Sequence, residues 1–190
     1  MTRLSSLALA LSLCLPLSLR AAWRPIALAP VQVFAPGQKT WLDMAVEVEF
    51  EAQAENARLR VSRRLLGHPL TARLDFKHLP HYAEWISQNQ ARGGAEWAAL
   101  KAVLDEVGDG PAMALTQEAL PAQGSVKLLL GLRRGSHFEL FATVPGQMGA
   151  CGSSLCCDLG EPAFATQSGQ LLWTLLKPSA LSQAKMAANR

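Results

Sequence analysis

The sequence contains little of what usually marks a nucleic-acid-binding or multidomain protein. Only 17% of its 190 residues are charged, and the formal net charge is +3. Because DNA- and RNA-binding domains carry clustered lysine and arginine, this balance does not support nucleic-acid binding, and none is expected. The chain also has no internal repeat and no linker long enough to divide it. These absences predict a single domain.

Motifs for the common chemistries are missing as well. The chain has no Cys-x-x-Cys pair and no His-x-x-x-His pair. Gly152 precedes Ser153 and Ser154, but Cys156 occupies the position where a Gly-x-Ser-x-Gly elbow needs its second glycine. We therefore expect no cofactor, and an enzyme could be present only with an active site dispersed along the sequence.

The first 22 residues have the pattern of a secretory signal peptide. Arg3 gives a basic start, residues 4–19 form an apolar run without charge, and residues 20–22 end in two alanines. The run is too short to span a bilayer comfortably. Cleavage is predicted after Ala21 or Ala22, and no transmembrane segment is expected in the mature chain.

Export would place the mature protein in the periplasm or outside the cell, where disulfides can form. The mature chain is predicted to consist of a globular domain at residues 23–178 and a flexible tail at 179–190. Removal of residues 1–22 removes two arginines and no acidic residue, so the net charge falls from +3 to +1. Lipid attachment at Cys14 is disfavoured, because no small residue directly precedes that cysteine.

Alternating or continuous apolar residues predict strands towards both ends of this domain. The predicted strands cover residues 31–34, 44–53, 58–65, 71–76, 125–132, 138–144 and 171–176. Between them, apolar residues at helical spacing predict two amphipathic helices at 80–90 and 96–107. This order favours an α+β fold, with a mostly antiparallel sheet and the two central helices packed on one face.

The second and third predicted strands alternate acidic and basic residues with apolar ones. When they are folded as a hairpin about Glu55-Asn56, Glu51 faces Arg60 and Glu47 faces Arg64. Opposite charges across a strand pair stabilise it. This ladder is the candidate interaction surface, and its residues are Glu47, Glu49, Glu51, Arg58, Arg60 and Arg64.

All three cysteines of the predicted mature chain lie in a glycine-rich segment, residues 145–162. A disulfide from Cys151 to either Cys156 or Cys157 would close this segment as a loop. A bond between the adjacent Cys156 and Cys157 is disfavoured by disulfide geometry. One thiol then remains, which could be buried, react or pair with another subunit.

Four histidines occur in the chain, and three of them are weak metal candidates. His78 and His81 are three residues apart, but Pro80 lies between them, so a shared helical face is not expected. His137 could join the cysteines in a metal site, yet no spacing typical of a zinc ligand set supports this. We interpret these histidines as ordinary surface or capping residues, and no metal is expected.

The sequence thus predicts an exported, non-catalytic protein that binds a protein partner in the cell envelope. An accessory subunit, an assembly factor and an inhibitor-like module all fit this class. The alternative is a thiol-redox or metal-binding protein centred on Cys151, Cys156 and Cys157. The second alternative is an enzyme with a dispersed active site. The oligomeric state and the identity of the partner do not follow from the sequence.

Overall fold

A computed structural model describes residues 24–35, 40–53, 56–74, 76, 82–91, 93–105 and 110–177. Within 24–50 and 52–53 it describes the backbone alone. The predicted signal peptide with Cys14, the predicted tail at 179–190, and His78 and His81 lie outside the described residues.

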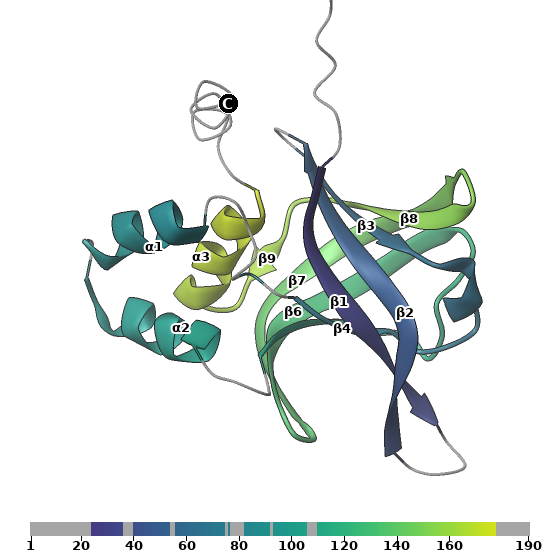
Figure 1. Cartoon of the computed structure of the whole chain (residues 1–190), viewed down its shortest axis with the longest axis horizontal. Helices are drawn as coiled ribbons and strands as arrows, with labels where there is room; N and C mark the ends of the chain where they lie inside the picture. The colour runs from purple at the N-terminus through teal and green to yellow at the C-terminus, as the bar shows by residue number, and fades with distance from the viewer. Residues whose placement is uncertain are drawn as a thin grey trace, which may run out of the picture.

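The described residues form a mixed α+β fold (Figure 1). The strands are β1 (Arg24–Ala35), β2 (Thr40–Gln53), β3 (Asn56–Val61), β4 (Thr71–Arg73), β5 (Pro111–Leu115), β6 (Gly124–Arg134), β7 (His137–Cys151), β8 (Ser154–Leu159) and β9 (Ala163–Phe164). The helices are η1 (Arg63–Leu65, 3-10), α1 (Tyr82–Gln90), α2 (Ala95–Asp105) and α3 (Gln167–Leu176).

The strands belong to one sheet with the order β6-β5-β4-β1-β2-β3-β8-β7-β9. β6 also pairs with β7, so the sheet curls until its two sides meet. Every pairing between these strands is antiparallel, which confirms the predicted sheet type. In Figure 1, β1 and β2 cross in front of β6 and β7.

Alternate residues of the strands fill the space that the curled sheet encloses. Leu59 on β3, Leu128 and Leu130 on β6, and Leu155 on β8 are each no more than 1% exposed. These side chains belong to one hydrophobic cluster, which also contains buried residues of all three α-helices. The period of two therefore places an apolar set inside and leaves polar side chains outside.

Helix α3 connects the helices to the sheet. The Oγ1 of Thr166 accepts a hydrogen bond from the backbone N–H of Gly169 (3.1 Å) and so caps its first turn. A Cβ on Gly169 would approach the backbone of Phe141 on β7 to less than 3.0 Å, so only glycine permits this packing. Four apolar side chains of the helix are buried, namely Leu172, Trp173, Leu175 and Leu176.

The prediction of a strand at residues 171–176 is therefore wrong. An apolar run of this length fits a buried strand or a buried helix equally well. The helix is favoured by the N-cap at Thr166 and by the close packing of Gly169 against β7.

The two central helices were predicted correctly, and in the described residues they cover Tyr82–Gln90 and Ala95–Asp105. α1 is bonded to α3, because Trp85 Nε1 donates to Thr174 Oγ1 (3.2 Å). The rings of Trp85 and Trp97 join α1 to α2 edge to face, with centroids 5.4 Å apart. α2 contacts α3, and α3 in turn contacts β7 and β9. That α1 and α2 both cover one face of the sheet stays a prediction.

Other predicted strands are present with different limits. The hairpin at 125–144 is confirmed, with Gly135 and Ser136 between the paired residues Arg134 and His137. β4 is shorter than the predicted strand at 71–76, and β5 was not predicted. β5 lies between β4 and β6 in the curled sheet, but it is rich in alanine and begins with a proline. Both residue types are uncommon in strands, so the sequence did not predict one here.

Candidate functional site

The β2–β3 hairpin forms the predicted charge ladder, but in a different register. Glu51 pairs with Arg58 and Glu49 with Arg60, two residues away from the predicted pairs. The predicted pairs are therefore wrong. On β3, Leu59 and Val61 are buried and alternate with the half-buried Arg58 and Arg60, so the predicted faces of this strand are correct.

Glu51 and Arg60 nevertheless form an ion pair along the diagonal of the hairpin. Arg60 donates from its terminal guanidinium nitrogen to Glu51 Oε1 (2.9 Å). Glu51 is only 3% exposed, whereas the side chain of Arg60 is 41% exposed. Glu51 Oε2 is buried and has no hydrogen-bond partner within the described residues. The arginine thus compensates a carboxylate that the fold has largely removed from water.

A second ion pair continues the ladder onto β8. Arg58 Nε donates to Asp158 Oδ1 (2.6 Å), and the two residues are direct partners across β3 and β8. Asp158 in turn pairs with Gln147 on β7, whose Oε1 accepts from Ser125 Oγ on β6 (3.1 Å). A polar row therefore runs around the outside of the curled sheet from β3 to β6.

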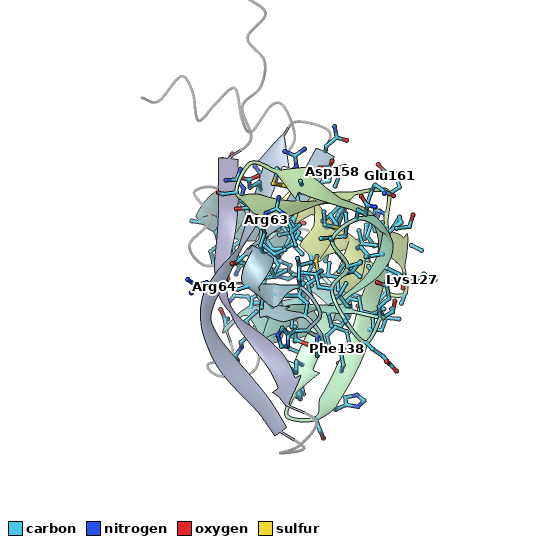
Figure 2. All side chains as sticks on the ribbon, turned by 90° about the vertical axis from the view of Figure 1, so that its right-hand side faces the viewer. Arg63, Arg64, Lys127, Phe138, Asp158 and Glu161 are labelled. Carbon is cyan, nitrogen blue, oxygen red and sulfur yellow. A yellow bond between two sulfur atoms is a disulfide. The ribbon has the colours of Figure 1, made fainter. Side chains whose placement is uncertain are left out.

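Arg63 and Arg64 lie just beyond the end of β3, in η1. Arg63 donates to the backbone carbonyls of Ser153 (3.2 Å) and Gly152 (3.4 Å), so it is tied to the turn between β7 and β8. Figure 2 shows Arg64 projecting outward at the edge of the molecule. The predicted pairing of Arg64 with Glu47 is wrong, because β3 ends before residue 64.

These residues define one surface, called the charged face below. It consists of Arg58, Arg60, Arg63, Arg64 and Asp158, together with the buried carboxylate of Glu51, and Figure 2 labels Arg63, Arg64 and Asp158. Of the side chains that the structure describes on this face, four are arginines and two are acidic. The side chains of the other two predicted members, Glu47 and Glu49, lie outside the described residues.

The sequence prediction missed Asp158 and Arg63. The alternation of Leu155, Cys157 and Leu159 with more polar neighbours would have indicated that Asp158 faces outward. No sequence signal indicated that Arg63 would contact a turn that lies about ninety residues away along the chain.

The cysteine-rich segment is a hairpin and not the predicted loop. β7 continues to Cys151, Gly152 and Ser153 form the turn, and β8 begins at Ser154. Cys151 and Cys156 form a disulfide with their Cα atoms 5.7 Å apart, which selects one of the two predicted pairings. The bond links the two strands near the turn and therefore restrains the part of the molecule that Arg63 contacts.

The remaining thiol, Cys157, faces the core. It is 1% exposed, and burial, assisted by the nearby charge of Asp158, raises its pKa to about 12. The thiolate is the reactive form of cysteine, so this side chain stays protonated and inert at neutral pH. The geometry of Cys157 therefore offers no support to thiol-redox chemistry.

His137, the third weak metal candidate, is exposed at the first residue of β7. Within the part of the chain that the structure describes, no three His, Cys, Asp or Glu side chains are placed to hold a metal ion. Cys151 and Cys156 are bonded to each other and cannot act as thiolate ligands while the disulfide is intact.

Among the described residues, no helix combines the length and the apolar character that crossing a membrane requires. Comparisons of the chain with protein-family models, with curated proteins and with solved structures find no match.

Proposed function

We propose that this chain is an exported, non-catalytic protein that binds an acidic segment of a protein partner in the cell envelope through the charged face. The observation that carries the proposal is the set of four arginines in β3 and η1, two elements that contain no acidic residue. Electrostatic complementarity of this kind steers association and selects partners of opposite charge.

The arginines are held before any partner arrives. Arg58 and Arg60 are oriented by ion pairs, and Arg63 is oriented by two backbone carbonyls. Their placement on paired strands reduces the conformational entropy that binding would otherwise cost. Arg64 supplies a further charge at the margin of the face, where a partner can reach it.

Export is part of the same proposal. Disulfides such as Cys151–Cys156 persist in oxidising compartments. The signal-peptide pattern at residues 1–22 predicts that the chain reaches such a compartment by secretion.

The proposed fold also has α1 and α2 packed on one face of the sheet. In Figure 1 the helices lie at the left, whereas β3 and β8 lie to the right.

The test is recovery of a partner by chemical cross-linking in intact cells, with Arg64→Glu as the variant. Arg64 is exposed, and its reversal should leave the fold intact. Lys127→Glu is the matched control, because Lys127 is also an exposed cation but lies elsewhere on the surface (Figure 2). Arg58→Gln is the second test variant, at the centre of the charged face.

We expect one envelope protein to be cross-linked by the wild type and by Lys127→Glu. Arg64→Glu and Arg58→Gln should each reduce its affinity by about tenfold, and added salt should reduce it further. Equal recovery by all variants would place the contact elsewhere on the molecule. Absence of any cross-linked protein with the wild type would reject the proposed function.

A further inference from the structure

The Cys151–Cys156 disulfide lies on the outside of the curled sheet and not in its core. Cys156 is the direct partner of Arg60 across β3 and β8, so the two side chains leave the same face of the sheet. Cys151, at the end of β7, is half-buried. The buried hydrophobic cluster contains Cys157 but neither of the bonded cysteines. One end of the bond is therefore accessible to a molecule in solution.

The hairpin that carries the bond is held by backbone pairing as well. β7 and β8 form six residue pairs, from Gly146–Leu159 to Cys151–Ser154, and β8 forms five more with β3. The bonded cysteines are only five residues apart in the sequence, and so small a ring contributes less chain entropy than a long loop does. The bond can thus open and close while the strands stay paired, as a redox site requires.

Arg63 places a positive charge at the turn beside the bond. Its Nε and Nη2 donate to the carbonyls of Ser153 (3.2 Å) and Gly152 (3.4 Å), the two residues that directly follow Cys151. Arg63 is exposed, and it has no acidic partner among the described residues. A guanidinium group in this position stabilises a nearby thiolate and attracts anionic reagents.

The acidic side chains that the structure describes on this face are already engaged. Glu51 is paired with Arg60 (2.9 Å). Asp158, two residues beyond the disulfide on the same face of β8, is paired with Arg58 (2.6 Å). Each of these carboxylates is balanced by its own arginine, whereas Arg63 is not balanced by either. The described charges beside the bond therefore favour the thiolate forms, and with them the reduced pair.

The third cysteine is kept out of this chemistry. Cys157 follows Cys156 directly, but its side chain points to the opposite face of β8 and is 1% exposed. Burial, with a smaller contribution from the charge of Asp158, raises its pKa to about 12. A buried, protonated thiol does not attack a disulfide, so Cys151 and Cys156 recover the same bond after each reduction.

From these features we infer that Cys151–Cys156 is a redox-active disulfide that exchanges with an anionic dithiol. The inference goes beyond the proposed function and does not depend on a protein partner, because small thiols suffice to test it. It also gives the arginines beside the bond a chemical role, which is to attract the attacking thiolate and to stabilise the one that leaves.

The exchange takes place in two steps. A thiolate of the dithiol attacks Sγ of Cys151, the more accessible sulfur, and Cys156 leaves as a thiolate beside Arg60 and takes a proton from water. The second thiolate of the dithiol then attacks its own sulfur in the mixed disulfide and releases Cys151, which is protonated in turn. Cys151 and Cys156 gain two electrons and two protons, and the dithiol loses both and becomes a disulfide.

The test is the rate at which small thiols open the bond in the full mature protein. 3-Mercaptopropionate and cysteamine are matched probes, since they carry a carboxylate and an ammonium group, respectively, on the same two-carbon chain. The reaction is stopped with an alkylating reagent, and the mass shows how many thiols have been freed. Each rate is divided by the rate of the same thiol with the protein unfolded in concentrated urea, which removes the intrinsic reactivity of the thiol.

We expect 3-mercaptopropionate to open the bond about tenfold faster in the folded protein than in the unfolded one. The folded-to-unfolded ratio for cysteamine should be at least about threefold smaller, because its ammonium group is repelled by the arginines. A slower reaction in the folded protein would identify a purely structural bond and overturn the proposal. Equal ratios for the two thiols would overturn it as well.

Arg63→Gln and Arg63→Lys separate the charge from the contact with the turn. Glutamine removes the charge, whereas lysine keeps it. Arg63→Gln should slow the reaction with 3-mercaptopropionate at least about threefold, and Arg63→Lys should react nearly as the wild type does. Lys127→Gln is the control, at an exposed cation elsewhere on the surface (Figure 2). Circular dichroism verifies that the variants are folded. An unchanged rate in Arg63→Gln, or an equal loss in Arg63→Lys, would contradict the role of the charge.

Discussion

Gly146 on β7 and Cys157 on β8 face each other so closely that a Cβ on Gly146 would overlap Cys157 Sγ. Val126 on β6 closes the same space from the other side, 3.1 Å from that Cβ position. The missing side chain of Gly146 is therefore what allows the thiol into the core. The two positions are matched in volume, as is usual in protein interiors that are packed to crystal density.

This match predicts a rescue. Gly146→Ala should lower the free energy of unfolding by about 1–3 kcal/mol, because it overpacks the core. Cys157→Ala alone leaves a small cavity, but in the double variant the new methyl group occupies the space that the sulfur has vacated. The double variant should therefore be more stable than the sum of the single effects implies, by at least about 1 kcal/mol.

Urea denaturation of the four proteins measures this coupling. Gly149→Ala is the control, because it lies on the same strand and a Cβ there meets no atom within 4 Å. The proposed coupling would be contradicted if the changes in the free energy of unfolding at Gly146 and Cys157 were additive. It would also be contradicted if Gly149→Ala lost as much stability as Gly146→Ala, because the loss would then not depend on contact with the sulfur.

The raised pKa of Cys157 predicts how stability depends on alkaline pH. Its pKa is about 12 in the folded protein against an ordinary value of 9.0, since burial disfavours the thiolate. The stabilisation is thus fully present below pH 9.0 and is lost as the pH rises from there towards 12. The slope reaches at most about 1.4 kcal/mol per pH unit.

Tyr82 acts in the same direction, because burial and then the charge of Asp105 raise its pKa above the ordinary 10.0. Cys157→Ala should therefore flatten the decline without abolishing it. Urea denaturation at a series of pH values measures both proteins, with Cys151→Ser/Cys156→Ser as the common background to prevent disulfide exchange. An identical decline with and without Cys157 would contradict the assignment of this effect to the thiol.

Removal of the disulfide should weaken the fold without abolishing it. The bond between Cys151 and Cys156 closes a ring of only a few residues, which corresponds to about 2 kcal/mol of chain entropy in the unfolded state. The backbone pairs of β7 and β8 run from Gly146–Leu159 to Cys151–Ser154 and remain without it. Cys151→Ser/Cys156→Ser should keep its circular dichroism spectrum and unfold at lower urea, whereas collapse of the spectrum would show that the hairpin depends on the bond.

The sequence allowed the faces of the strands to be predicted better than their partners. The β2–β3 pairs were displaced by two residues, since Gln53 pairs with Asn56 and the predicted hairpin turned about Glu55-Asn56. Opposite charges fit either register, because Glu51 has Arg58 directly across and Arg60 along the diagonal. Turn geometry decides between such registers, and residues 54 and 55 carry no strong turn signal.

Long-range contacts explain what the sequence could not predict. The glycines of β7 suggested a loop, but Gly146 is needed where the strand approaches Cys157. The apolar run at 171–176 fits a strand or a helix equally well. The need for a glycine at position 169 follows only from its close contact with Phe141 on β7, which the sequence does not show.

The ion pair between Glu51 and Arg60 predicts an unequal response to the loss of either partner. Arg60→Ala leaves the carboxylate of Glu51 buried without its compensating charge, which should lower the free energy of unfolding by about 2–3 kcal/mol. Glu51→Gln removes the charge and keeps the shape. Because Glu51 Oε2 has no hydrogen bond to lose within the described residues, this change should cost about 1 kcal/mol or less.

Arg58→Ala is the matched control, since it breaks an ion pair whose acid, Asp158, is 60% exposed. Such exposed pairs contribute at most about 1 kcal/mol. Urea denaturation at neutral pH therefore should rank Arg60→Ala as clearly the least stable of the three variants. If Glu51→Gln were the more damaging change, the carboxylate would have to stabilise the fold through a partner other than Arg60, and the burial of Glu51 would have to be explained by that partner.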